Sequence, residues 1–315
     1  MKDNFGRDIY YLRMSITDRC NLRCIYCMPE NCGELQKQDD LLTINEIKEI
    51  VRAASNCGIT KVRLTGGEPL VRSDILDICR VVSQTPGIVE LCLTTNGVLL
   101  TKLAEDLKAA GVTRLNISLD SLNPETYCKI TRNGNLESAI HGIKAGLLVG
   151  FDAIKINSVL IGGINDNDIL DLLELTRRYN ANVRFIEMMP IGESAEWAET
   201  RFLSASKVLE LSPELEKIGA DGVAQLYKLP GGIGTVGLIS PISSHFCPTC
   251  NRIRVASDGT LKPCLHSAEE INLRGLKGKD LEEAISSAIF RKPQKHKLDE
   301  GEISSSIKNM NEVGG

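Results

Sequence analysis

The sequence predicts an α/β fold, a partial and open (β/α)6 barrel of the TIM type. Three observations lead to this prediction. Short runs of β-branched and apolar residues alternate with amphipathic helical stretches, the alternation is repeated to give six strands between residues 10 and 190, and it stops after Pro190. Such alternation builds βαβ units with right-handed crossovers, and six units leave an eight-stranded barrel incomplete.

The predicted strands are short and apolar, as buried parallel strands are. They are Tyr11–Thr17, Lys61–Thr65, Val89–Thr94, Arg114–Leu119, Ile154–Leu160 and Val183–Glu187. In barrels of this type the active site gathers at the C-terminal ends of the strands. Polar and cysteine residues that follow these strands are therefore candidates for function.

Helical stretches lie between the strands. The first begins with a capping box in which Thr43 and Glu46 satisfy each other's backbone amides. Glycines mark the ends of several helices, as expected for residues that accept left-handed backbone angles. The predicted helices cover residues 43–58, 101–111, 136–149 and 166–179.

After Pro190 the pattern changes to a glycine-rich run and a second group of cysteines, without a further βα repeat. We therefore divide the chain into a partial barrel, residues 1–190, and a C-terminal region, residues 191–315, that closes it. The last fifteen residues end in Gly314 and Gly315 and are expected to form a flexible tail.

The composition predicts a cytoplasmic protein that binds neither membranes nor nucleic acid. The formal net charge of −4 gives no general attraction to either partner. No apolar run approaches the ~18–20 residues that span a bilayer, and the N-terminus lacks a signal-peptide core. Single scattered cysteines fit a reducing compartment and are expected to be small buried residues. They are Cys32, Cys57, Cys79, Cys92 and Cys128.

Three cysteines, Cys20, Cys24 and Cys27, follow the first predicted strand directly. Their C-x3-C-x2-C spacing allows one loop to hold three corners of a [4Fe–4S] cluster through thiolates. The fourth iron then has no protein ligand and stays open for chemistry, as one position does in catalytic metal sites. The alternative is a structural zinc loop, for which Cys32 would have to supply the fourth ligand.

A second triplet consists of Cys247, Cys250 and Cys264. Between them Asp258-Gly259 is a strong hairpin signal, and a hairpin would bring Cys264 back toward the other two cysteines. Spacing alone leaves two interpretations open, an iron–sulfur site or a Cys3His zinc site completed by His245 or His266.

Together these motifs resemble the radical S-adenosylmethionine superfamily and, within it, the GTP 3′,8-cyclase family of molybdenum cofactor biosynthesis. The resemblance runs nearly end to end. Besides the two triplets, the matching runs are Lys61–Pro69, Thr94–Gly97, Asn116–Asp120, Cys250–Arg254 and the closing Gly314-Gly315.

The resemblance implies two [4Fe–4S] clusters, one on each cysteine triplet, and S-adenosylmethionine as cofactor. In that family the first cluster cleaves S-adenosylmethionine reductively to a 5′-deoxyadenosyl radical. Four residues match positions that contact S-adenosylmethionine: Tyr26, Gly67, Ser118 and Met189.

The substrate implied by the resemblance is GTP. Hydrogen abstraction from C3′ of the ribose would lead to (8S)-3′,8-cyclo-7,8-dihydroguanosine 5′-triphosphate, with the guanine ring on the open iron of the second cluster. The matching GTP contacts are Arg13, Arg63, Thr94, Lys155, Arg252 and Arg254. A catalytic role in the late reduction step is assigned to Arg252 and Arg254, and Lys61 is a further candidate phosphate contact.

The resemblance also implies a homodimer and a cyclic pyranopterin monophosphate synthase that consumes the product. A flavodoxin or ferredoxin is a chemically reasonable electron donor. The resemblance further implies a double-glycine tail inserted into the active site. Three alternatives stay open: a peptide-modifying radical S-adenosylmethionine enzyme with an auxiliary cluster, an iron–sulfur electron carrier, and a zinc-stabilised, non-catalytic interaction protein.

Overall fold

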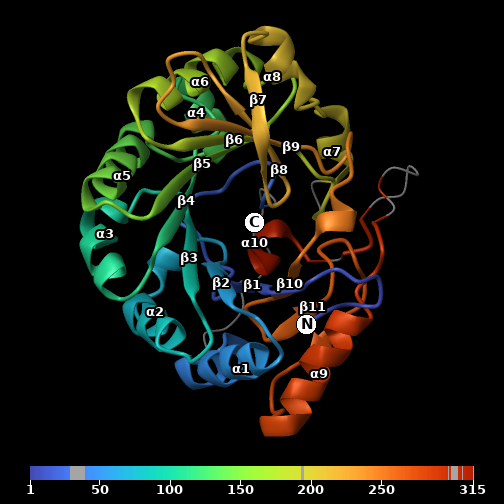
Figure 1. Cartoon of the computed structure of the whole chain (residues 1–315). Coiled ribbons are helices and arrows are strands. Elements are labelled where there is room, and N and C mark those ends of the chain that lie inside the picture. Colours follow the sequence, from blue (N-terminus) through green and yellow to red (C-terminus); the bar gives the residue numbers. More distant parts are fainter. Residues whose placement is uncertain (29–39, 193–194, 297, 299–303, 307, 315) are drawn as a thin grey trace.

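The computed structural model of the chain describes residues 1–28, 40–192, 195–296, 298, 304–306 and 308–314. The described residues form one twelve-stranded sheet that curves around a central space, with helices on its outer side. Figure 1 shows this arrangement as an open ring of strands inside a ring of helices. No helix among the described residues is long and apolar enough to cross a membrane.

The predicted strands are confirmed, and each is parallel to the next along the chain. They are β1 (Tyr11–Ser15), β2 (Lys61–Thr65), β3 (Glu90–Thr95), β4 (Arg114–Ser118), β5 (Ala153–Leu160) and β6 (Asn182–Glu187). Neighbours in sequence are neighbours in the sheet, which is the topology of a β/α barrel.

The C-terminal region adds a parallel strand on each side of this six-stranded core, and the sequence did not predict these two pairings. β9 (Thr235–Ile239) pairs with β6, and β10 (Arg252–Val255) pairs with β1. The latter pairing joins residues about 240 positions apart in the chain, and local periodicity carries no signal for it. In the strand order of the described residues, β9 and β10 are not neighbours, so the barrel is open.

Antiparallel strands extend the sheet further at both ends. β7 (Glu216–Asp221) and β8 (Ala224–Lys228) form a hairpin beside β9, and β11 (Thr260–Lys262) and β12 (Ile271–Asn272) continue from β10. The hairpin predicted at Asp258-Gly259 is confirmed between β10 and β11, with Gly259 at φ +88°. The full order is β12-β11-β10-β1-β2-β3-β4-β5-β6-β9-β8-β7.

Most of the helices cover the outer face of the sheet, whereas α10 (Met310–Val313) lies inside the barrel (Figure 1). α1 (Ile44–Asn56) begins with the predicted capping box, and α5 (Leu136–Val149) has the predicted bounds, ending at Gly150 with φ +73°. The helices predicted at 101–111 and 166–179 are α3 (Leu100–Ala109) and α6 (Ile169–Arg178). The remaining helices are α2 (Ile75–Ser83), α4 (Pro124–Thr131), α7 (Ala195–Thr200), α8 (Ser206–Leu211) and α9 (Gly278–Phe290).

Side-chain alternation along the strands separates the core from the site. In β1, Leu12 and Met14 are fully buried in the main apolar core between sheet and helices. Tyr11 and Arg13 point the other way, into the central space. The inner face of the sheet therefore carries polar and charged residues, whereas the outer face supplies the packing energy.

The described end of the chain packs inside the barrel. α10 lies near the middle of the ring in Figure 1, and its residue Val313 is fully buried. Arg254 donates a hydrogen bond to the carbonyl oxygen of Gly314. The expected flexible tail is thus not found for residues 310–314, because α10 has its own capping box and an apolar contact surface. Gly315 lies outside the described residues.

The single cysteines are only partly as expected. Cys79 and Cys92 are buried, Cys57 is half-buried, and Cys128 is exposed. The prediction of burial was wrong for Cys128 because its position on α4 faces outward, a helix that the sequence did not reveal. Cys32 lies outside the described residues.

Candidate active site

One cavity opens on the inner side of the barrel and brings the two cysteine triplets together. It is lined by the loops that follow β1 to β4, by inward-facing strand residues, and by the region around β10. The cysteines of both triplets and all the S-adenosylmethionine and GTP contacts that the resemblance implies lie in its wall. They are Cys20, Cys24, Cys27, Cys247, Cys250, Cys264, Tyr26, Gly67, Ser118, Met189, Arg13, Arg63, Thr94, Lys155, Arg252 and Arg254.

The first cysteine loop is held by hydrogen bonds to its own sulfur and backbone atoms. The amide of Leu22 donates to Sγ of Cys20 at 3.3 Å, and Nδ2 of Asn96 reaches the same sulfur at 3.9 Å. The amide of Cys27 donates to the carbonyl oxygen of Cys24 at 2.9 Å. Burial raises the pKa of the Cys20 thiol to about 11 and also raises that of Cys24. Thiolates at this site therefore need a bound cation such as iron.

Gly67 packs directly against the beginning of this loop. Its amide donates to the carbonyl oxygen of Thr17 at 2.7 Å, and a Cβ at this position would lie 2.3 Å from the carbonyl oxygen of Arg19. No larger residue fits, since the obstacle is backbone. Beside it, the buried Glu68 accepts hydrogen bonds from the amides of Asn96 and Leu70, at 2.6 and 3.0 Å. These bonds tie the ends of β1, β2 and β3 together.

Tyr26 is fixed by a carboxylate on the wall of the cavity. Its hydroxyl donates to Oδ2 of Asp120 at 2.8 Å, and the amide of Val159 donates to Oδ1 at 2.8 Å. Burial raises the pKa of Asp120 to about 6. Ser118, at the end of β4, and Met189, after β6, line the same part of the cavity.

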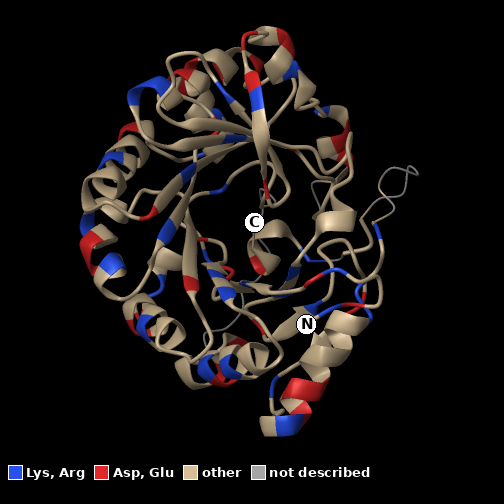
Figure 2. Ribbon diagram, viewed as in Figure 1, with Lys and Arg blue, Asp and Glu red and all other residues tan. Residues whose placement is uncertain are grey.

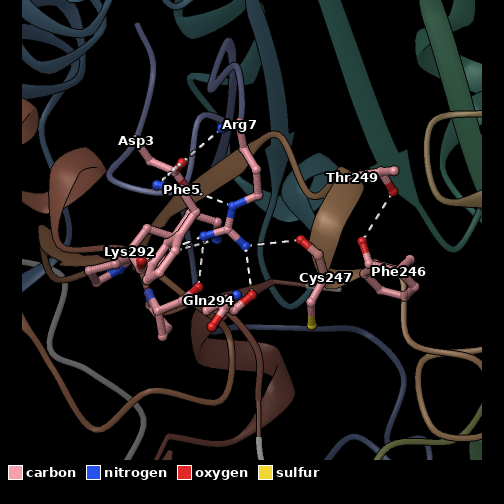
Figure 3. Close-up of polar contacts among 10 residues, drawn as sticks. Asp3, Phe5, Arg7, Phe246, Cys247, Thr249, Lys292 and Gln294 are labelled. Carbon is pink, nitrogen blue, oxygen red and sulfur yellow. Dashed lines mark hydrogen bonds and ion pairs between the residues drawn. The ribbon is translucent and has the colours of Figure 1, made fainter.

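The second cysteine loop is held by Arg7 from the N-terminal segment, a residue that the sequence analysis did not select (Figure 3). Arg7 is buried, and its Nη1 donates to the carbonyl oxygen of Cys247 at 2.9 Å. Its Nη2 donates to the carbonyl oxygen of Pro293 at 2.7 Å, and Nε donates to Oδ2 of Asp3 at 2.6 Å. The guanidinium thus joins three segments that are distant in sequence.

The electrostatic surroundings of the second triplet differ from those of the first. Burial acts to raise the pKa of Cys250, but the positive charges of Arg252 and Lys292 and hydrogen bonds from Arg252 lower it to about 6. Burial raises the pKa of Cys247. Cys250 is therefore a thiolate near neutral pH, ready to bind iron or zinc.

Histidines also gather at this triplet. One ligand atom each of His245, Cys247 and His296 lies within 4.8 Å of the other two, close enough to share a metal ion. His266 packs edge-on against His296, with ring centroids 5.1 Å apart. This group differs from the Cys3His site that the sequence left open, because it contains one cysteine, Cys247, and two histidines, of which the sequence did not suggest His296.

Strand register places three arginines side by side on the inner face of the sheet. Arg13 of β1 lies opposite Arg254 of β10 on one side and opposite Arg63 of β2 on the other. Burial, together with the charges of Arg252 and Arg63, lowers the pKa of Arg13 to about 10. Burial and the charges of Arg13 and Arg252 lower the pKa of Arg254 well below its usual value. Such a row is electrostatically favourable only when an anion lies against it. Figure 2 shows Lys and Arg on the strands of the barrel wall as well as on the outer helices.

Two further cations line the cavity on the opposite wall, where Lys155 of β5 and Arg184 of β6 both contact Asp221. The sequence predicted Lys155 but not Arg184 or Asp221. Several buried polar atoms of the described cavity wall have no hydrogen-bond partner within the protein, which is expected where a polar ligand binds. They are Nε of Arg13, Nε of Arg184, Oδ1 of Asn116 and Oδ1 of Asn157.

Comparisons with known proteins agree with this arrangement. Residues 14–176 match the family model described as Radical SAM superfamily, and residues 181–298 match the model described as Molybdenum Cofactor Synthesis C. A solved structure of Streptococcus suis SuiB bound to S-adenosylmethionine has a TM-score of 0.65 at 16% identity, covering 89% of this chain and 68% of that one. Coproporphyrinogen III oxidase from Escherichia coli has a TM-score of 0.51 at 13% identity, covering 75% of this chain and 64% of that one.

The fold and the site define a radical S-adenosylmethionine enzyme. A protein of Alkaliphilus metalliredigens named GTP 3′,8-cyclase is 49% identical over 320 residues, covering 100% of both chains. Another of the same name, from Clostridium acetobutylicum, is 45% identical over 319 residues and also covers 100% of both. The chain therefore belongs to the GTP 3′,8-cyclase family, whose members are radical S-adenosylmethionine enzymes of molybdenum cofactor biosynthesis.

Membership of the superfamily implies S-adenosylmethionine and a [4Fe–4S] cluster, and the first cysteine loop fits both. Its three cysteines are present as thiols that line the cavity, with an amide donor on one sulfur. Gly67 has no side chain, and the structure leaves no room for one. Its backbone atoms therefore stay accessible to a ligand in the cavity.

Proposed function

We propose that this chain converts GTP to (8S)-3′,8-cyclo-7,8-dihydroguanosine 5′-triphosphate within the cavity described above. The observation that carries the proposal is the convergence of two cysteine triplets and a set of buried cations on one cavity. A radical reacts with whatever C–H bond lies nearest, so holding both reactants in one enclosed space is the main requirement for catalysis. Relatives named GTP 3′,8-cyclase at 45–49% identity support this choice of substrate.

In this proposal residues 1–190 carry the radical-generating site. Cys20, Cys24 and Cys27 hold the first cluster, which with bound S-adenosylmethionine supplies a 5′-deoxyadenosyl radical. Four residues contact S-adenosylmethionine: Tyr26, Gly67, Ser118 and Met189. The bond from Tyr26 to Asp120 fixes the ring of the tyrosine, so that the cofactor meets a rigid wall.

Residues 191–315 carry the second site in this proposal. Cys247, Cys250 and Cys264 hold a second [4Fe–4S] cluster, where the guanine ring binds. Zinc on His245, Cys247 and His296 is the competing occupant, and both sets use Cys247. The two occupants are therefore mutually exclusive, and metal analysis distinguishes them.

The triphosphate and ribose would be bound by cations and one hydroxyl that line the cavity. The row formed by Arg254, Arg13 and Arg63 presents forked donors that match phosphate oxygens in geometry. Lys155 and Thr94 complete the set of contacts, with Lys61 beside Arg63 on β2. Arg252 and Arg254 lie next to the second triplet, where they can stabilise negative charge or donate a proton in the last step.

The remaining partners in the proposal are an electron donor such as a flavodoxin or ferredoxin, and a cyclic pyranopterin monophosphate synthase that takes up the product. A homodimer and a cytoplasmic location belong to the same proposal. The electron donor follows from the chemistry, because reductive cleavage of S-adenosylmethionine consumes an electron.

The experiment is anaerobic turnover. The protein is reconstituted with iron and sulfide and incubated with dithionite, S-adenosylmethionine and GTP, and products are followed by mass spectrometry. We expect 5′-deoxyadenosine together with an isomer of GTP. Formation of 5′-deoxyadenosine without any change in GTP would exclude GTP as the substrate while keeping the superfamily.

A further inference from the structure

We propose that Asp221, at the tip of the β7–β8 hairpin, is an internal anion that occupies a phosphate position before substrate binds and is then exchanged for substrate phosphate. This inference rests on the proposed function only in assuming that a polyphosphate enters the cavity. The inference adds a negatively charged residue to the cationic contacts of the site. This residue competes with phosphate and so lowers the affinity of the site for phosphate.

The contacts of Asp221 are those expected of a phosphate oxygen. A single carboxylate oxygen, Oδ2, lies 2.6 Å from Nζ of Lys155 and 2.5 Å from Nη2 of Arg184. The two cations come from neighbouring strands, and Lys155 lies opposite Asn182, two positions before Arg184, so both side chains share the inner face. All three residues line the cavity that contains the cysteine triplets. One anionic oxygen thus already bridges two cations of the candidate triphosphate site.

The two sides of this ion group differ in burial. The side chains of Lys155 and Arg184 are only 9% and 10% exposed, whereas that of Asp221 is 49% exposed. The cations are therefore fixed parts of the wall, while the carboxylate reaches them from the solvent side. When the carboxylate leaves, it returns to water at little cost, whereas the cations would stay desolvated and need another anion.

The hairpin that carries Asp221 is suited to move. All six residues of β7 are exposed, and β7 pairs only with β8 among the described strands. The pairing has an irregularity between Lys217 and Gly219, and Gly219 and Gly222 have φ +142° and +61° with no atom near their Cβ positions. In Figure 1 the hairpin extends from the rim toward the middle of the barrel. A two-stranded edge with few contacts opens more easily than a core strand.

The net charge of Lys155, Arg184 and Asp221 favours replacement of the Asp221 carboxylate by a triphosphate. The two cations and the one carboxylate of this ion group have a net charge of +1, so they still attract phosphate. The charges of Lys155 and Arg184 keep the pKa of Asp221 at about 2, against the effect of burial, so Asp221 is an anion at every working pH. A triphosphate can displace the carboxylate because its other phosphates are bound by the arginines of β1, β2 and β10. A single small anion lacks those extra contacts and competes poorly.

The experiment measures binding rather than turnover. The cluster-loaded protein and its Asp221→Asn variant are titrated anaerobically with inorganic triphosphate, GTP and guanosine by calorimetry. Asparagine has nearly the same shape but no charge, so the competing anion is lost. We expect triphosphate and GTP to bind about 10-fold more tightly to the variant, because the binding-competent fraction rises, and guanosine to bind unchanged.

Glu216→Gln is the matched control, since Glu216 is an exposed residue of the same strand outside the cavity. It makes the same change in charge and should leave all three affinities unchanged. Amide hydrogen exchange on the wild type gives a second measurement: triphosphate should accelerate exchange at residues 221–224. Weaker or unchanged triphosphate binding by Asp221→Asn, or equal effects of Glu216→Gln, would overturn the inference. Tighter triphosphate binding without any cyclised GTP would refute the proposed function and leave the exchange intact.

Discussion

The guanidinium of Arg7 donates a 2.9 Å hydrogen bond to the carbonyl oxygen of Cys247, which lies 240 residues further along the chain. The same side chain bonds to the carbonyl oxygens of Pro293 and Gln294 and to the buried carboxylate of Asp3. The second cysteine site is thus assembled on an N-terminal residue (Figure 3). Its geometry depends on a contact outside both cysteine motifs.

Replacing Arg7 should selectively damage the second site. Arg7→Ala leaves Asp3 as an uncompensated buried charge and frees the backbone at Cys247, which costs several kcal/mol locally. We expect about four iron atoms per chain to be lost, one [4Fe–4S] cluster, while the first cluster stays. Iron and sulfide analysis with electron paramagnetic resonance measures this.

Two further variants accompany the Arg7 prediction. Arg7→Lys keeps the charge but loses the multiple carbonyl contacts, so it should give an intermediate iron content. Arg52→Ala, on the exposed face of α1, is the control and should keep full iron content. Equal iron in Arg7→Ala and wild type would show that Arg7 does not position the second site.

The first cysteine loop should be required for all radical chemistry. Cys24→Ala removes a half-buried thiol of the triplet, so we expect loss of the first cluster and of 5′-deoxyadenosine formation. Cys128→Ala changes an exposed thiol on α4 and should be silent in both assays. Retention of 5′-deoxyadenosine formation by Cys24→Ala would contradict the assignment of the cluster to this loop.

Gly67→Ala tests the close approach between the β2 loop and the cysteine loop. The added methyl group would meet backbone atoms of Arg19 at 2.3 Å, so the loops must separate. We expect S-adenosylmethionine affinity to fall at least about 10-fold, measured by anaerobic equilibrium binding. Gly146→Ala is the control, because its methyl group would meet only the ends of side chains, those of Leu115 at 3.3 Å, Ile154 at 3.5 Å and Ile117 at 4.0 Å. Similar binding by both variants would remove the role given to Gly67.

Tyr11 makes the phosphate site sensitive to alkaline pH. Burial acts to raise the pKa of Tyr11, but the charges of Arg63 and Arg13 outweigh it and lower the pKa from 10 to about 8. The folded state therefore favours the phenolate, and the free energy of unfolding should gain about 3 kcal/mol between pH 8 and pH 10. The same phenolate neutralises Arg63, so triphosphate affinity should fall as pH rises through 8.

Tyr11→Phe is the test of this pH effect. The variant should show neither the gain in stability nor the loss of triphosphate affinity above pH 8, in chemical unfolding and calorimetric titrations respectively. A wild-type affinity that is flat between pH 7 and pH 9 would contradict the lowered pKa. A fall of equal size in both proteins would assign the effect to another group.

Local sequence signals were sufficient for the core of the fold. The apolar strand runs, the capping box at Thr43 and the helix that ends at Gly150 depend on residues close together in the chain, and all three appear as predicted. The parallel pairings of β9 with β6 and of β10 with β1 were not predicted, because these partners are distant in sequence. The helices α2 and α4 were not predicted either, because their sequences carry no clear local helix signal.

The residues of the candidate site likewise fall into those that the sequence predicted and those that it did not. Cysteine spacing and family motifs selected residues that all line one cavity. They could not select Arg7, Tyr11, Arg184 or Asp221, since each matters through partners on other elements: Cys247, Arg63, and the ion group on β5 and β6. Charged residues of this kind are usually exposed, and only tertiary contacts distinguish them.

Deuterium transfer from the ribose of GTP to 5′-deoxyadenosine would show that both ligands bind in the same cavity. The cluster-loaded protein is given S-adenosylmethionine, reductant and GTP deuterated at C3′, and 5′-deoxyadenosine is analysed by mass spectrometry. If both ligands share the cavity as proposed, deuterium appears in 5′-deoxyadenosine, and GTP deuterated at C2′ gives none. Unlabelled 5′-deoxyadenosine from the C3′-labelled substrate would contradict hydrogen transfer between the two sites.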